Sequence, residues 1–423
     1  MARRFFYGWF LVGIAWVLYG FGMSPAYYSW GFFTPEIIEE LGLTRAQMGY
    51  VFGLFTFIFS GVAPLTGVAM NRWGIRAVLS AGAATAALGF LLVSRMDSLH
   101  EAILYYAILG GIGVGLSTVL PAQTIATNWF VKYRARAVAI ILIAGGVVGR
   151  LVTRFDRAMI ESFSWRTGWV VIAAVSASLA VLAAVFVRNS PEDLGQLPDG
   201  REASDRPDSV SGESEPTPEA EPIWAAADAI RTPQFALLCM AAMGYALPWV
   251  VVVQHGRLHL QDLGFSTQIA AGILGTMILV SIVGRLSGSL GDFVKPQVVY
   301  GCALALEGLG VLGLLGATTP ATAGAATVAI GLGFGAAFIS SPLVFASFFG
   351  RRAFATINGT RLLIVGIFSA VAPGIAGAVF DRTGTYTSAF VGLIVISAVG
   401  SIAALICKSP VQKTVHGAAA AHR

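Results

Sequence analysis

The chain has 423 residues, of which 56% are hydrophobic and only 12% are charged, and its mean hydropathy is +0.76. A soluble domain keeps about 25% charged residues, so this composition excludes a soluble globular protein. The formal net charge is +5, but the cations are not gathered with aromatic side chains on one polar face, which argues against nucleic-acid binding.

Apolar runs of about 20 residues predict about twelve membrane-spanning helices, and therefore an all-α integral membrane protein. In chain order we expect them at 7–33, 45–70, 76–95, 101–127, 136–161, 167–187, 233–256, 267–291, 297–317, 320–346, 357–380 and 387–407. Thr44 to Gln47 form a predicted capping box at the start of the second span.

Lysine and arginine collect at the ends of alternate spans, and the intervening loops carry acidic residues such as Glu36 and Asp262. Short cytoplasmic loops of membrane proteins are enriched in these cations, so both termini are expected to be cytoplasmic. The three cysteines have no metal-binding spacing, and we expect neither a metal nor another cofactor.

Two stretches of the chain repeat each other about half a protein apart. Gly111 to Gly115 precede Pro121, and Gly331 to Gly335 precede Pro342 with similar spacing. Such a duplication is typical of transporters with a solute site between two halves. The predicted divisions are a first six-helix bundle, a polar cytoplasmic linker, a second bundle and a cytoplasmic tail: 1–188, 189–231, 232–408 and 409–423.

The linker has the composition of a largely disordered segment, except that residues 223–231 could form a short interfacial helix.

The stretches 67–76 and 284–292 occupy corresponding places in the two halves, and the first has Asn71 in its middle. Both resemble the loop between spans two and three of the major facilitator superfamily and its counterpart in the second half, although an aspartate is usual in that family where this chain has Asn71. Three further stretches resemble bacterial monocarboxylate porters and oxalate/formate antiporters: 7–9, 128–130 and 191–200. The resemblance implies two pseudo-symmetric six-helix halves, alternating access, a small organic anion as substrate, and a bacterial inner membrane.

The loop motif predicts a gate. An arginine and a carboxylate at the cytoplasmic ends of neighbouring spans can tie the halves shut, and the candidates are Asn71, Arg72, Arg76 and Asp292. Asn71 carries no charge, so the latch of the first half should be the weaker one. Alternatively, Arg72 and Arg76 serve only the membrane topology.

An ionisable group within a span is costly and is therefore a functional candidate. Arg285 lies seven residues before Asp292, roughly 10 Å deeper along a helix. A guanidinium there can grip a carboxylate with two parallel hydrogen bonds. In the relatives, an arginine in span eight contacts the substrate anion, and the resemblance implies this role for Arg285; the alternative is a structural arginine between helices.

Three further arginines are candidates for the cavity. Arg150 and Arg154 stand one turn apart in span five, and either they add positive charge to the cavity or this part of the span approaches its outer end. Arg361 lies near the start of span eleven, where oxalate-type relatives carry a lysine somewhat deeper, nearer Val365. Its alternative role is a cytoplasmic arginine that snorkels to the membrane surface.

The usual proton relay of eukaryotic relatives is incomplete here. Their span-eight arginine follows an aspartate by one turn, but this chain has Ser281 at that position and lacks their span-one lysine. His255 and Glu307 are tentative substitutes. His255 could instead be an interfacial histidine, and Glu307 a buried partner for an arginine or a permanently protonated acid.

Aromatic side chains of spans one and seven can supply donors and apolar walls: Tyr27, Tyr28, Tyr245 and Trp249. The preferred hypothesis is a monomeric, proton-coupled importer or exporter of mono- or dicarboxylates. An anion exchanger and an exporter of amphipathic compounds are the alternatives. No nucleophile, metal or phosphate-loop motif favours an enzyme or an ATP-driven pump.

Overall fold

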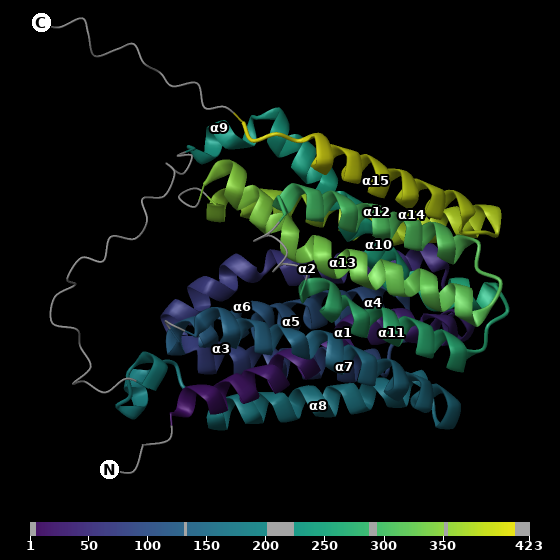
Figure 1. The fold of residues 1–423 in the computed structure, drawn as a ribbon. Coiled ribbons are helices and arrows are strands. Elements are labelled where there is room, and N and C mark those ends of the chain that lie inside the picture. Colours follow the sequence, from purple (N-terminus) through teal and green to yellow (C-terminus); the bar gives the residue numbers. More distant parts are fainter. Residues whose placement is uncertain (1–5, 131–132, 201–223, 287–293, 351–353, 411–423) are drawn as a thin grey trace, which may run out of the picture.

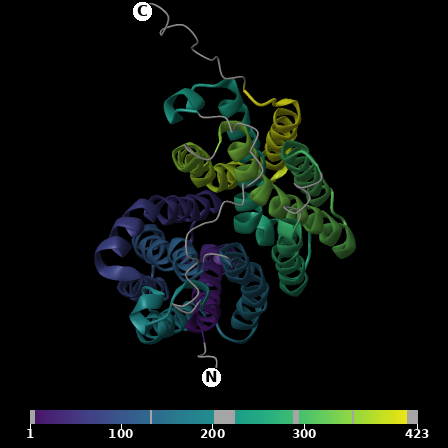
Figure 2. The same cartoon turned by 60° about the vertical axis from the view of Figure 1, so that its left-hand side comes forward.

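The computed structural model describes residues 6–130, 133–200, 224–286, 294–350 and 354–410, which contain helices and no strands. The first half contains α1 (Tyr7–Leu41), α2 (Arg45–Gly61), α3 (Ala63–Val93), α4 (Leu99–Ala102), the π-helical η1 (Ile103–Gly110), α5 (Gly111–Ser117), α6 (Val119–Trp129), α7 (Arg134–Ser162) and α8 (Trp165–Phe186). The second contains α10 (Pro233–Asp262), α11 (Thr267–Leu286), α12 (Pro296–Leu315), α13 (Pro320–Phe349), α14 (Phe354–Thr383) and α15 (Thr387–Ile406). Figures 1 and 2 show the two halves as adjacent bundles.

Twelve spans are present, as predicted. Eleven helices of the described residues are long and apolar enough to cross a membrane. The twelfth span consists of α2 and the first part of α3, because Gly74 has a φ of 80° and reverses the chain within α3. A side chain at Gly74 would also press on the amide of Asn189, at 2.8 Å, so glycine suits this turn on both counts.

Spans one and seven are longer than the sequence predicted. The expected spans ended at residues 33 and 256, but α1 continues to Leu41 and α10 to Asp262. A span predicted from apolar residues ends where a charged side chain appears. Each of these helices has a charged residue directly after its apolar run. These two charges, Glu36 and Arg257, pair with each other across the halves, so both helices can continue.

The first part of the polar linker is ordered. It forms two short 3-10 turns, η2 (Pro191–Leu194) and η3 (Pro198–Gly200), and Gln196 accepts a hydrogen bond of 3.1 Å from the backbone of Tyr7. Residues 201–223 lie outside the described residues. The predicted short helix is α9 (Ala226–Ile230), and the predicted capping box at Thr44 is confirmed.

The start of α1, the turns η2 and η3, α9 and the end of α15 lie at one end of the bundle, here called the terminal end, and the opposite end is here called the distal end (Figure 1). The halves meet where α1 packs on α10, α2 on α14 and α7 on α11. On α2, a Cβ at Gly53 would overlap the carbonyl oxygen of Ala370, and one at Gly49 that of Pro373. The backbones of α2 and α14 therefore touch directly towards the distal end.

The same seam is open towards the terminal end. Gly67 lies 18 residues after Gly49, five full turns along an α-helix and therefore on the same face, yet a Cβ there would meet nothing within 4 Å. On α14, Gly359 likewise lies 18 residues from Gly377. A Cβ at Gly377 would lie 2.5 Å from the backbone of Arg45, whereas one at Gly359 would meet nothing within 4 Å. The seam between α2 and α14 is thus in backbone contact towards the distal end and open at these two glycines towards the terminal end.

We expect Gly53→Ala to destabilise this arrangement and Gly67→Ala to leave it intact. Both changes bring the same gain in helix propensity, about 1 kcal/mol, but only the first forces two backbones apart, at a cost of roughly 1–3 kcal/mol. Thermal unfolding of the two purified variants measures the difference. Equal melting temperatures would show that the seam is not closed at Gly53.

Candidate functional site

Arg285 lies at the meeting point of both halves. It is half-buried at the end of α11, and its guanidinium donates a 3.3 Å hydrogen bond to the carbonyl oxygen of Leu142 on α7. The centre of the guanidinium lies 5.2 Å from the ring of Phe338 on α13. Its Nε is buried without a hydrogen-bond partner among the described residues, so one donor remains for a ligand.

Two tyrosines of α1 face the same guanidinium. Arg285 interacts electrostatically with the phenol groups of Tyr19 and Tyr28. Glycines of α7 make room for both rings, since a Cβ at Gly145 would lie 3.1 Å from the Tyr19 hydroxyl and one at Gly149 would lie 2.8 Å from the Tyr28 ring. The helices α1, α7, α11 and α13 therefore position one cation among hydroxyl groups and an aromatic ring.

Tyr27, the other candidate tyrosine of span one, lies beside Tyr28, with ring centroids 5.3 Å apart. Its ring also packs at 5.2 Å against Phe52 of α2. Tyr27 thus faces the seam between α1 and α2 rather than Arg285.

Arg361 is buried in the second half and does not snorkel. Its side chain on α14 is 4% exposed, and it donates hydrogen bonds to Ser341 (2.6 Å) and to the hydroxyl of Tyr245 (3.2 Å). Its Nε is buried and has no partner among the described residues. The alternative of a surface arginine is therefore wrong.

Both arginines lie against phenylalanines spaced at helical intervals on α13, here called the aromatic column: Phe334, Phe338 and Phe345. Arg285 lies over Phe338 and Arg361 lies 5.4 Å from the ring of Phe345, seven residues or about 10 Å further along the helix. In the other direction, Phe338 packs at 5.8 Å on Phe334, which stacks on Trp249 at 3.8 Å. Trp249 thus packs on the aromatic residues of α13, and the hydroxyl of Tyr245 accepts a hydrogen bond from Arg361.

Arg150 lies apart from this group. Its guanidinium donates to the carbonyl oxygens of Gly272 (3.2 Å) and Ala271 (3.4 Å) on α11. Gly272 is 13 residues from Arg285, about 20 Å along the helix. Arg154 is exposed, so the two arginines that share a predicted face have different surroundings.

The distal end holds a cluster of charged residues that joins the halves: Glu36, Arg45, Arg257, Asp262, Asp381 and Tyr386, here called the distal cluster. Arg257, 1% exposed, binds Glu36 with two hydrogen bonds of 2.6 Å and also donates to the carbonyl oxygen of Phe32. Arg45 binds Asp262 at 2.5 and 2.9 Å.

Sequence reasoning missed Arg257, because it follows an apolar run and reads as the end of a span. The signal available was the opposite charge of Glu36 at the matching end of span one, which the fold packs against span seven.

His255 belongs to the distal cluster and not to the site around Arg285. It is fully buried, so it is not an interfacial histidine. One ring nitrogen lies 2.8 Å from the carbonyl oxygen of Pro373 and the other 3.0 Å from the hydroxyl of Tyr386, which accepts a hydrogen bond from Arg45. A neutral ring that donates to Pro373 and accepts from Tyr386 satisfies all three groups.

Glu307 is buried between α12 and α13, where Gly333 lets the two backbones approach closely. Neither carboxyl oxygen has a hydrogen-bond partner among the described residues. Among the described residues, no arginine is hydrogen-bonded to Glu307 as one alternative had predicted.

The predicted gating residues of the first half lie at the terminal end. Asn71, Arg72 and Arg76 are exposed, and the backbone N–H of Arg76 donates to the side chain of Asn189 at 3.1 Å. Asp292 lies outside the described residues. The gating role stays a prediction.

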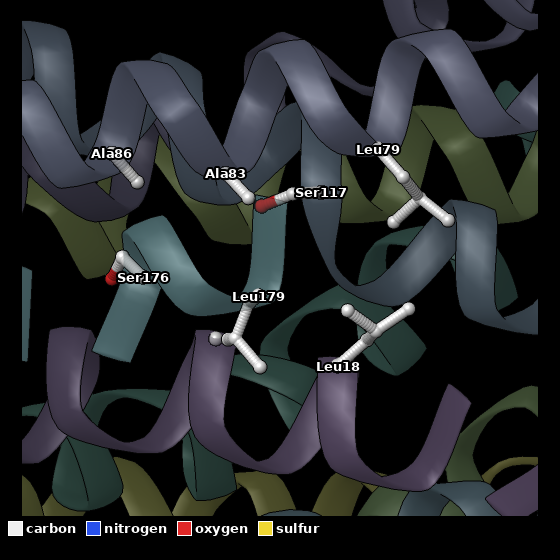
Figure 3. Close-up of a pocket in the computed structure, with 8 residues that line it drawn as sticks. Leu18, Leu79, Ala83, Ala86, Ser117, Ser176 and Leu179 are labelled. Atoms are coloured by element: carbon white, nitrogen blue, oxygen red, sulfur yellow. The ribbon is translucent and has the colours of Figure 1, made fainter. Parts of the chain in front are cut away.

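A small pocket within the first half offers little chemistry (Figure 3). Its lining is mostly apolar, including Leu18, Ala83 and Leu179. The hydroxyls of Ser117 and Ser176 donate to carbonyl oxygens of their own helices, at 2.7 and 2.9 Å. Among the described residues, no group of three metal-ligating side chains comes together.

Comparisons with known proteins agree with this architecture. The model of the Major Facilitator Superfamily matches residues 8–360. Monocarboxylate transporter 4 of Rattus norvegicus is 22% identical over 91% of this chain and 79% of its own length, and monocarboxylate transporter 11 of Homo sapiens is 24% identical over 92% and 81%. A solved bacterial homologue of the human lysosomal transporter Spinster, in an inward-facing and occupied conformation, superposes with a TM-score of 0.74, with 15% identity and coverage of 95% and 97%.

The family match spans most of the chain, and it agrees with twelve spans in two halves whose seam is closed at one end. The protein therefore belongs to the major facilitator superfamily and is a multi-pass membrane transporter rather than an enzyme.

Proposed function

We propose that this transporter moves small organic anions, mono- or dicarboxylates, and that Arg285 binds the substrate carboxylate. The observation that carries the proposal is the position of Arg285: half-buried between the halves, with a buried Nε that has no partner among the described residues. The similarity to proteins named monocarboxylate transporters supports the same substrate class.

The surroundings of Arg285 suit a carboxylate with a carbon chain. A guanidinium binds a carboxylate through two parallel charge-assisted hydrogen bonds, and the hydroxyls of Tyr19 and Tyr28 can donate to the same anion. Phe338 and the aromatic column provide an apolar wall for the carbon chain. A monocarboxylate needs only this part of the site.

Arg361 is the second cation that a dicarboxylate can use. It lies against Phe345, which is about 10 Å further along α13 than Phe338, the ring beside Arg285. Tyr245 and Ser341 hold the side chain of Arg361 in place. Arg150, on the seam to α11, is the weaker candidate for this role. Two cations without an acidic partner among the described residues at this place disfavour the alternative of an exporter of cationic compounds.

Alternating access follows from the two ends of the seam. With the terminal end cytoplasmic, the structure corresponds to an inward-open state held by the distal cluster. In the opposite state these contacts break, and the exposed residues Asn71, Arg72 and Arg76 together with Asp292 close the terminal end. The membrane of a bacterial cell is the proposed location.

Anions entering a cell that is negative inside oppose the membrane potential, at about 2.3 kcal/mol per charge per 100 mV. Accumulation therefore requires a co-transported cation or an exchanged anion. We favour proton symport, and anion exchange is the second candidate.

Arg285→Ala is expected to abolish saturable uptake of L-lactate and oxalate into proteoliposomes, because the anion loses its only paired charge at this point. Arg285→Lys keeps the charge but not the planar fork, so it should transport with a clearly raised KM. Uptake of the Ala variant with unchanged KM would remove Arg285 from the site.

Arg361→Gln is the matched comparison, since it removes the second cation from the same aromatic column. It should weaken transport of oxalate and succinate more than that of L-lactate. An equal loss for all three acids, together with a lower melting temperature, would identify Arg361 as a structural residue.

Glu36→Gln is expected to open the distal end. Breaking one partner of a buried ion pair costs about 3–5 kcal/mol, so a cysteine in place of the buried Val253 should react with a maleimide at least about tenfold faster. Arg166→Gln is the control, because Arg166 pairs with Glu40 and Asp97 of its own half. Unchanged labelling of the Glu36 variant would show that the distal cluster does not hold the halves together.

The coupling is tested with an inward pH gradient across proteoliposomes, with and without internal carboxylate. Proton symport predicts uphill uptake driven by the gradient alone. Uptake that responds only to internal anion would identify an exchanger instead.

A further inference from the structure

A second ionisable group lies buried beside the distal cluster. Asp156 on α7 is fully buried, and its Oδ1 accepts a 2.8 Å hydrogen bond from the hydroxyl of Ser29 on α1. Its Oδ2 is buried without a partner among the described residues. An ionised carboxylate with one unsatisfied oxygen is costly to bury, so this conformation favours a protonated Asp156.

The charged group that faces Asp156 from a neighbouring element is Arg257 of α10, which acts on it electrostatically. Ser29 of α1 also faces Asp156, and the acid of α1 that is bonded to Arg257 is Glu36. Arg257 is already bound to Glu36, the carbonyl oxygen of Phe32 and the hydroxyl of Thr267 on α11. The neighbouring cation of its own helix, Arg157, pairs with Glu161. The guanidinium of Arg257 thus acts electrostatically on Asp156 but is hydrogen-bonded to Glu36 of α1.

The two acids differ in what their bond to Arg257 would do. The pair of Arg257 with Glu36 closes the distal end, since it ties α10 to the far end of α1. An ionised Asp156 would compete for the same guanidinium and weaken that pair. The charge of Asp156 therefore sets the strength of the distal closure.

A small pocket lies beside this region. Its lining includes Arg257, Thr153 and Tyr28. Thr153 precedes Asp156 by one turn of α7, and Tyr28 interacts with Arg285. Arg257 of the distal cluster and a tyrosine of the candidate anion site therefore line the same pocket.

We propose that Asp156 carries the coupled proton and that the Arg257–Glu36 pair senses its protonation. The inference rests on the proposed proton symport and assigns that proton a site. With the distal end open, the carboxylate takes up a proton from the outer solution, an O–H bond forms, and Arg257 is left to Glu36, which closes the distal end. When the proton leaves through the terminal opening, the carboxylate attracts Arg257, and the distal end can reopen.

Glu307 is the contrasting buried acid. It is as buried as Asp156, but burial is the only influence acting on it, and no charged group of the described residues faces it. It lies between α12 and α13, within one half, so its protonation cannot change the seam. Glu307→Gln is therefore a matched control for Asp156→Asn.

The first test needs no substrate. We expect labelling of the cysteine at position 253 to accelerate with rising pH, beyond the rise that the thiolate itself causes, as Asp156 ionises. Asp156→Asn keeps the acceptor for Ser29 but cannot ionise, so this excess should disappear, and it should persist in Glu307→Gln. The same pH response in Asp156→Asn as in the parent protein would overturn the inference.

The second test separates the inference from the proposed function. In proteoliposomes with an inward pH gradient, Asp156→Asn should equilibrate L-lactate and oxalate without accumulating them, while exchange with internal acid continues. Asp156→Glu, which restores a titratable group, should regain part of the accumulation and also guards against a folding defect. Full accumulation by Asp156→Asn would refute the role of Asp156, whereas a parent protein that ignores the gradient would refute the symport itself.

Discussion

The ion pair between the buried guanidinium of Arg257 and the carboxylate of Glu36 organises the contact between the two halves. Arg257 is 1% exposed and lies close to the seam, so Glu36 of the other half must reach it. Both helices continue past their apolar runs to make this pair. Because an unpaired buried charge is so costly, the loss of either partner of this pair would strongly destabilise the distal contact.

Glycine makes the same contact possible sterically. At Gly49 and Gly53 the backbone of α2 lies directly against that of α14, and no other residue would fit there. Towards the terminal end the same faces carry glycines that touch nothing. Small residues of this kind allow two helix backbones in a membrane to approach each other closely.

The charges of the seam are arranged by depth. The distal cluster contains cations and carboxylates that satisfy each other, whereas Arg285 and Arg361 are surrounded by tyrosine, serine and aromatic rings. Neither of these two arginines has an ion pair among the described residues. An excess of donors over acceptors at this place supports the proposed anion site, and the surrounding aromatic rings lower the local dielectric constant.

The amino-acid sequence by itself determined the class of the protein, its twelve spans and its duplication, because apolar length and cation placement are local properties of the chain. It also indicated Arg285 as a candidate, since a charge inside an apolar span stands out wherever the span is placed. Residue type and spacing were sufficient for these features.

Only the tertiary structure decided how the charges are used. Arg150 and Arg154 share a face by spacing, yet one binds carbonyl oxygens of α11 and the other is exposed. Arg361 was a candidate for the cavity with a surface position as the alternative, and only the structure shows that it is buried beside Ser341 and Tyr245. Arg257 and Asp156 were not singled out at all. The physical reason is that burial and pairing depend on segments far apart in the chain, such as Glu36 and Arg257, which are 221 residues apart.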